Sequence, residues 1–148
     1  MSTASDQFRE QGYLVLPGFK SMADIALVRA RAAEIVEHFD PAQSRTISTT
    51  NEQERQVDTY FMGSADKVRC FFEEEAFDTH GALKQAKALS INKIGHALHD
   101  LDPVFERFSR GTALAAVAQE VGLANASIWQ SMYIFKQPGI GGEVRWHQ

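Results

Sequence analysis

The sequence has a single cysteine, Cys70, among its 148 residues. One cysteine excludes an internal disulfide and a thiolate cluster that could hold zinc or an iron-sulfur centre. This fits a reducing compartment, and we expect a cytoplasmic protein. Long hydrophobic runs are also missing, because the longest run of small apolar residues, Ala113–Ala118, is far too short to span a bilayer. The first ten residues are polar and mixed in charge, so we expect neither a signal peptide nor a membrane anchor.

No cluster of basic residues is present. The 15 basic and 19 acidic residues are scattered along the chain and give a net charge of -4, so we do not expect nucleic acid as a partner. The 44% hydrophobic and 23% charged content is ordinary for a globular domain and is enough for a buried core. No internal repeat or low-complexity tract appears. The chain is therefore expected to be one domain, or a large part of one.

Helical patterns fill most of the first three quarters of the chain. Ser21 followed by Asp24 is typical of a helix cap, and apolar residues follow at helical spacing. This pattern predicts a helix from Met22 to His38 whose apolar side packs on a sheet. Other helices are predicted before Gly12, from Asp102 and Pro103 through Phe108, and from Gly111 to Gly122.

Strands are predicted for four short apolar segments, Tyr13–Leu16, Thr59–Met62, Val68–Phe72 and Ile128–Phe135. The last segment is apolar on both faces, with Met132 and Ile134 on one face and Tyr133 and Phe135 on the other. It is therefore expected to be a central strand. Residues 42–58 are interpreted as an irregular surface segment and residues 78–81 as a turn. Together these patterns indicate an α+β fold.

Two groups of polar residues invite a functional interpretation. The spacing of His96 and His99 would suit zinc, but no third and fourth ligand lies nearby, so a polar edge before the helix at Pro103 is favoured. The run Glu73–Glu75 is interpreted as a solvated face, because adjacent like charges repel one another.

Lys93 lies among apolar neighbours, where a lysine either extends its amine to solvent or pairs with an anion. From the residues alone the first alternative is favoured. The glycines at 139, 141 and 142 match neither the dinucleotide fingerprint nor the P-loop, and a hairpin turn is predicted for them.

The last residues carry a pattern related to metal binding. A short strand is predicted to end with Trp146, His147 and Gln148. Non-haem iron oxygenases use a His-x-carboxylate pair on one strand, because residues i and i+2 face the same side about 6 to 7 Å apart. A lone terminal histidine is more often a solvated or core residue than a ligand. Here Gln148 occupies the x position and no carboxylate follows it in the sequence.

Three segments resemble the phytanoyl-CoA dioxygenase family. They are GYLVLPGF at residues 12–19, SINKIGHALH at residues 90–99, and QSMYIFKQ at residues 130–137 leading to His147. The first is moderately specific, and the other two are long and specific. The similarity extends from about Gln7 to Gln148.

The resemblance implies a double-stranded β-helix enzyme that uses Fe(II) and 2-oxoglutarate to hydroxylate a small-molecule substrate. It implies that His147 is the first iron ligand, and that Lys93, Met132, His147 and Gln148 contact the cofactors. The aspartate, the second histidine and an arginine of the family pattern do not occur in these 148 residues. On this interpretation, residues 1–148 are the N-terminal portion of a single domain, with an incomplete barrel and no activity by themselves.

Two other functions remain open at this point. The first is a short non-enzymatic interaction module built on the same helices and strands. The second is a zinc protein that uses His96 and His99, which ranks last. The primary substrate and the oligomeric state are not indicated by the sequence.

Overall fold

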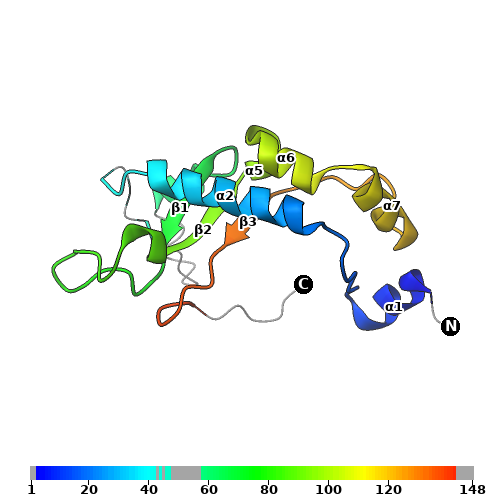
Figure 1. Ribbon diagram of the computed structural model, residues 1–148, viewed down its shortest axis with the longest axis horizontal. Coiled ribbons are helices and arrows are strands. Elements are labelled where there is room, and N and C mark those ends of the chain that lie inside the picture. The colour runs from blue at the N-terminus through cyan, green and yellow to red at the C-terminus, as the bar shows by residue number, and fades with distance from the viewer. Residues whose placement is uncertain (1–2, 43, 45, 48–57, 143–148) are drawn as a thin grey trace.

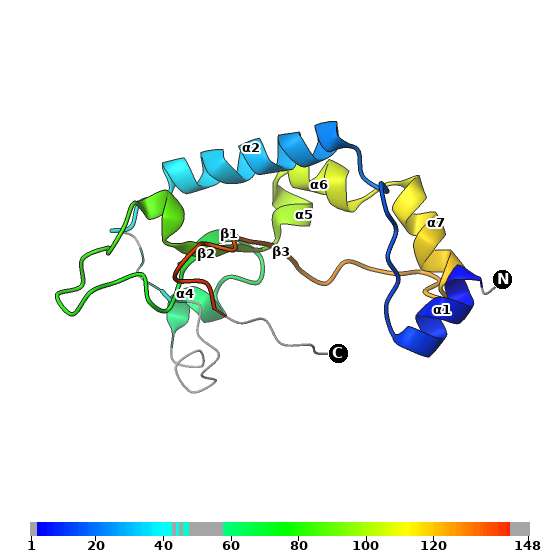
Figure 2. The same cartoon turned by 60° about the horizontal axis from the view of Figure 1, so that its bottom comes forward.

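The structure is a computed structural model, and it describes residues 3–42, 44, 46–47 and 58–142. Three antiparallel strands form one open sheet in the order β1-β2-β3. Helix α2 lies along one face of the sheet and α4 lies on the other (Figures 1 and 2). Helices α1 and α7 lie at one end of the elongated molecule. The elements are α1 (Ala4–Gln11), α2 (Met22–His38), α4 (Thr59–Met62), β1 (Val68–Phe72), η1 (Lys87–Leu89), β2 (Ile91–His96), α5 (Leu98–Leu101), α6 (Pro103–Ser109), α7 (Thr112–Glu120) and β3 (Ser131–Ile134).

The predicted helix Met22–His38 is confirmed. Ser21 and Asp24 form a capping box, in which the Ser21 hydroxyl accepts from the Asp24 backbone and the Asp24 carboxylate accepts from the Ser21 backbone. These reciprocal bonds satisfy two backbone donors at the start of the helix. Hydrogen bonding to Ser21 also lowers the pKa of Asp24. The cap is local in sequence, which explains why the start of α2 was predictable.

One core holds α2 and α6 against the sheet. The buried side chains come from one stripe of α2, from alternate positions of β1, from two positions of β2, and from α5 and α6. They include Val28, Ala32, Val36, Cys70, Phe72, Ile91, Ile94, Leu98 and Phe105. Burial raises the pKa of the Cys70 thiol to about 12, so at neutral pH this residue is a protonated core side chain and not a nucleophile.

Other predicted helix ends and turns are also confirmed. Gly12 ends α1 with φ 79°, a left-handed conformation that glycine adopts without a steric penalty. Asp102 caps α6 by accepting from the backbone N–H groups of Val104 and Phe105. The turn at residues 78–81 is closed by a 3.0 Å bond from the Gly81 N–H to the Asp78 carbonyl.

Two predicted strands are wrong. Residues 13–16 do not pair with the sheet, and Tyr13 and Val15 remain 50% and 69% exposed. Thr59–Met62 is a single helical turn, because the Asp58 carboxylate caps it by accepting from the Phe61 N–H. The aromatic residues of that segment favour a strand only where a neighbouring strand is available.

The C-terminal strand is shorter and less central than predicted. Within the predicted segment Ile128–Phe135 only Ser131–Ile134 is a strand, and in the described part of the chain the one strand beside β3 is β2, with a single further bridge from Ser131 to Ala97. Its alternation is as predicted, since Tyr133 and Phe135 pack on the core while Met132 and Ile134 each stay 42% exposed. Most of the predicted irregular segment 42–58 lies outside the described residues.

Candidate functional site

The face of the sheet opposite α2 carries Lys93 and Met132. Lys93 pairs with Ile134, and Gly95 pairs with Met132, so the four residues lie on alternate rungs of the ladder between β2 and β3 and share one face. A Cβ added at Gly95 would lie 3.4 Å from the Met132 Cγ, which means that Met132 packs directly over the glycine. Lys93 and Met132 were predicted to be neighbours in a binding site, and the register places them on one face of one sheet.

Two aromatic rings border the Lys93 amine. The Lys93 Nζ lies 5.7 Å from the centre of the Phe71 ring and 5.9 Å from that of Phe61. Phe71 is Lys93's partner across the β1–β2 ladder, and Phe61 comes from α4 and packs edge-on against Phe71. The side chain is half-buried, so the stem is covered and the ammonium group faces an apolar wall. Such a cation is well suited to hold a carboxylate.

His96 lies against the same two rings. Its imidazole is 5.7 Å from Phe61 and 5.4 Å from Phe71, and its Nδ1 is 2.8 Å from the Ser64 hydroxyl. The Ser64 hydroxyl donates its one hydrogen to the Phe61 carbonyl at 2.5 Å. His96 must therefore donate from Nδ1 to Ser64, which leaves Nε2 as an acceptor when the ring is neutral.

Burial lowers the pKa of His96 below its usual value of 6.5, and the nearby positive charge of Lys93 lowers it further. A hydrogen bond with the backbone of Ser64 acts in the opposite direction. The ring is therefore neutral at physiological pH. A protonated His96 would place a second positive charge near Lys93, and the lowered pKa of His96 avoids this.

The depressed pKa of His96 predicts a pH dependence of stability. Below pH 6.5 the unfolded chain takes up a proton that the folded chain resists, so the free energy of unfolding should fall as pH drops. The slope from this group should reach at most about 1.4 kcal/mol per pH unit. Denaturation with urea between pH 5 and 7.5 would measure it. His96→Asn keeps a donor for Ser64 without titrating, so this variant should show a shallower slope; equal slopes would contradict the prediction.

The interpretation of His96 and His99 as a polar edge is wrong. His96 is 7% exposed at the end of β2, and His99 is 3% exposed in α5. The Ser131 hydroxyl accepts from the His99 backbone N–H at 3.0 Å and lies 2.7 Å from its Nδ1. Each imidazole is thus held by a serine, and His99 connects α5 to β3. These contacts give both histidines a structural partner.

Glu73 also departs from its predicted place on a solvated face. It is 2% exposed, whereas Glu74 and Glu75 are exposed as predicted. Glu73 directly follows β1, where the chain turns inward, and its backbone N–H donates to the Ser90 carbonyl. The sequence of three adjacent glutamates could not show that Glu73 is buried and the other two are exposed, because the burial of Glu73 depends on the neighbouring strand.

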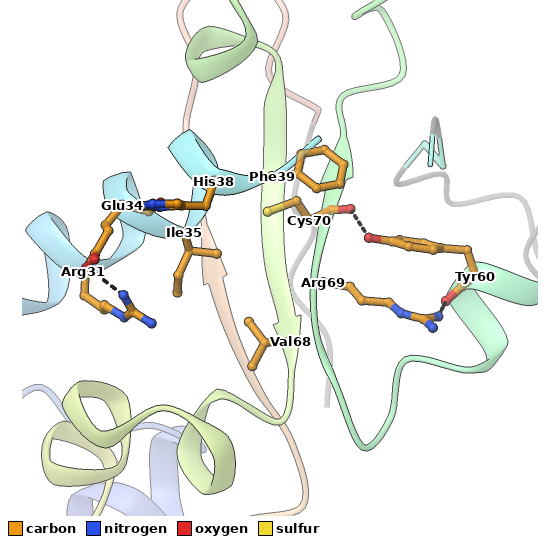
Figure 3. Close-up of a pocket in the computed structure, with 9 residues that line it drawn as sticks. All are labelled: Arg31, Glu34, Ile35, His38, Phe39, Tyr60, Val68, Arg69 and Cys70. Carbon is orange, nitrogen blue, oxygen red and sulfur yellow. Dashed lines mark hydrogen bonds and ion pairs between the residues drawn. The ribbon is translucent and has the colours of Figure 1, made fainter. Parts of the chain in front are cut away.

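A cavity of about 730 Å³ opens between α2 and the outer edge of β1 (Figure 3). Its cationic groups already have protein partners. Arg31 binds Asp102 at 2.7 Å and Glu34 at 2.6 Å, and Arg69 donates to the Tyr60 carbonyl. The cavity is lined by residues of α2, α4 and β1 and not by Lys93 or Met132. Lys93 and Met132 are the residues for which the family resemblance implies a cofactor contact, so we place the candidate site on their face of the sheet.

The sequence predicted four residues of this site, and they stay a prediction. Lys93 and Met132 lie on one face of the sheet, while the predicted ligand His147 and the neighbouring Gln148 lie outside the described residues. Sequence reasoning missed Phe61, Phe71 and His96, which surround the Lys93 amine. Phe71 could have been found from strand alternation in β1; Phe61 and His96 are brought there by α4 and by the end of β2, which sequence patterns did not indicate.

Among residues 3–42, 44, 46–47 and 58–142, no group of three or more His, Cys, Asp and Glu side chains is placed to hold a metal ion. Over the same residues, no helix combines the length and apolar character needed to cross a bilayer.

The fold and the site define an α+β protein with an open antiparallel sheet, helices on its core face, and a lysine beside aromatic rings on the other face. Residues 8–148 match the family model described as phytanoyl-CoA dioxygenase (PhyH). The chain therefore belongs to the phytanoyl-CoA dioxygenase family, as its sequence resemblance predicted.

Curated relatives agree with this assignment. The chain is 49% identical to "Phytanoyl-CoA dioxygenase" of Arabidopsis thaliana, over 97% of this chain and 50% of that protein. It is 46% identical to "Phytanoyl-CoA dioxygenase domain-containing protein 1" of Bos taurus, over 96% of this chain and 50% of that protein. With the Danio rerio protein of that name the identity is 44%, over 100% of this chain and 54% of that protein. The chain spans about half the length of these relatives.

Proposed function

We propose that this chain is the N-terminal portion of an Fe(II)- and 2-oxoglutarate-dependent dioxygenase that hydroxylates a small molecule. Residues 1–148 would form part of a single domain, with β1–β3 as the first strands of a double-stranded β-helix. The observation that carries the proposal is the Lys93 ammonium group beside Phe61 and Phe71, on the sheet face that also carries Met132.

Lys93 and Met132 suit a short dicarboxylate such as 2-oxoglutarate. The ammonium group would bind one carboxylate, and the apolar environment of Phe61 and Phe71 would strengthen that attraction by excluding water. Met132 offers a flexible apolar surface for the methylene groups. His96, neutral and with a free acceptor at Nε2, adds no charge that would compete with Lys93.

We assign His147 the role of iron ligand, and Gln148 a contact with 2-oxoglutarate. In this family, iron supplies oxidation by O₂ coupled to decarboxylation of 2-oxoglutarate to succinate. One histidine is not sufficient for an iron site, so we expect these 148 residues to be inactive alone. The half-exposed side chains of Met132 and Ile134, on a strand whose one strand partner among the described residues is β2, agree with a sheet that needs further strands. A cytoplasmic location is consistent with the single cysteine, which is buried.

Succinate formation tests the proposal directly. The complete gene product that contains this chain would be incubated with Fe(II), ascorbate and 2-oxoglutarate, in parallel with the 148-residue chain. We expect succinate from the complete product and none from the shorter chain. A complete product that forms no succinate and does not bind 2-oxoglutarate in the presence of Mn(II) would refute the proposal.

A further inference from the structure

We propose that the cavity between α2 and the outer edge of β1 binds an amphipathic carboxylate, with the carboxylate on Arg69 and the apolar part against α2. This site is separate from the Lys93 face and does not depend on the proposed function. Arg69 and Tyr60 lie on one side of β1, and Ile35 and Phe39 lie on the other (Figure 3). The volume of about 730 Å³ is within the range of about 300–1,000 Å³ that is usual for small-molecule sites.

The two arginines of the cavity differ in their partners. Arg31 binds two carboxylates, Asp102 at 2.7 Å and Glu34 at 2.6 Å, and they neutralise its charge. The Arg69 Nη1 instead donates to the Tyr60 carbonyl, which is a neutral acceptor. Because a guanidinium group has several N–H donors, this bond leaves Arg69 its positive charge and further donors for a ligand.

The acidic groups that are near Arg69 in the chain do not neutralise it. Asp66 pairs with Lys67 at 2.8 Å. Burial raises the pKa of the Cys70 thiol to about 12 and also raises the pKa of the Tyr60 hydroxyl. Both groups are therefore protonated and uncharged at neutral pH. An anion in the cavity would meet the positive charge of Arg69 without competition from these groups.

The Arg69 guanidinium group is held in place before a ligand binds. Its Cζ lies 4.3 Å from the centre of the Tyr60 ring. The Tyr60 hydroxyl donates to the Cys70 carbonyl at 3.3 Å, which fixes the ring against β1. An ordered guanidinium group loses little freedom on binding, and its planar donors match the two oxygens of a carboxylate.

The remaining lining of the cavity is largely apolar. Ile35 and Phe39 come from α2 and its C-terminal end, and Val68 and Cys70 come from β1. Ile35, Phe39 and Val68 pack against the core but are only partly buried. They present apolar surface to the cavity, and a hydrocarbon group that covered this surface would be stabilised by the removal of both from water. The lining therefore fits a carboxylate with an apolar body.

Octanoate is a suitable probe, with octanol and octylamine as controls of the same chain length and different head group. Binding to the complete gene product would be measured by calorimetry at pH 7.5. We expect octanoate to bind, octanol to bind at least about 10-fold more weakly, and octylamine not to bind, because only the carboxylate gains charge-assisted hydrogen bonds from Arg69.

Substitutions then place the carboxylate. Arg69→Met keeps an unbranched apolar stem without the charge, and it should raise the Kd of octanoate by at least about 10-fold. Arg69→Lys should have a smaller effect, because it keeps the charge but not the planar donors. Lys67→Met is the matched control, since Lys67 lies two residues from Arg69 but does not line the cavity. It should leave the Kd unchanged, as should Lys93→Met.

Several outcomes would overturn the proposal. They are a complete gene product that does not bind octanoate, equal binding of octanoate and octylamine, an unchanged Kd in Arg69→Met, and loss of binding in Lys93→Met, which would assign octanoate to the Lys93 face. If Arg69→Met does not fold, nuclear magnetic resonance of the parent protein decides. Octanoate should shift the backbone amide signals of Ile35, Val68 and Cys70, and shifts confined to Lys93 and its neighbours would refute the site. None of these results depends on succinate formation.

Discussion

Replacing Lys93 by methionine in the complete gene product is expected to raise the Kd of 2-oxoglutarate by at least about 30-fold. Loss of one partner from a desolvated charge pair typically costs about 2–5 kcal/mol, and about 1.4 kcal/mol corresponds to each factor of ten. Methionine keeps an unbranched apolar stem against Phe61 and Phe71 but carries no charge. Titration of 2-oxoglutarate in the presence of Mn(II), with oxygen excluded, would measure the change.

The control for Lys93 is Lys67→Met. Lys67 is a lysine that precedes β1, and its exposed side chain pairs with Asp66 at 2.8 Å. Its substitution should leave the Kd unchanged. Lys93→Arg should weaken binding less than Lys93→Met, because it keeps the positive charge. Equal Kd values for the parent and Lys93→Met would remove the observation on which the proposed function depends.

Phe72→Ala is expected to reduce the free energy of unfolding by about 3–5 kcal/mol. The Phe72 side chain is 0% exposed, and its ring lies 5.7 Å from Phe39 and 4.9 Å from Phe77. Alanine would leave a cavity between β1 and the end of α2, and the loss would be a large part of the 5–15 kcal/mol typical of a domain. Urea denaturation at pH 7.5, where His96 is neutral, would measure it.

Met62→Ala provides the comparison, because Met62 is 60% exposed at the end of α4. An exposed substitution of this kind should change the free energy of unfolding by no more than about 0.5 kcal/mol. If Phe72→Ala lost less than about 1 kcal/mol, the core as described would not be the main source of stability in this part of the protein.

Residues of the candidate site could be predicted only where they belong to a motif that resembles the family. Lys93 and Met132 were identified through the family resemblance, whereas the residues alone favoured a solvent-exposed lysine. β2 itself was not predicted, because Ile91–His96 lacks the regular alternation of a half-buried strand. Because that strand was not predicted, His96 was considered only together with His99, as a pair with a spacing that would suit zinc. For the same reason, the contact of Lys93 with Phe61 and Phe71 could not be predicted.

The sequence by itself determined the features that depend on near neighbours: the capped helix Met22–His38, the left-handed end at Gly12, the strand Val68–Phe72 and the alternating faces of Ser131–Ile134. These follow from side chains bonding to backbone three or four residues away and from the two-residue period of a strand. The tertiary structure decided which polar groups are buried and which segments pair. Glu73, His96 and His99 are buried, and residues 13–16 form no strand, because β1, β2 and β3 assemble from distant parts of the chain.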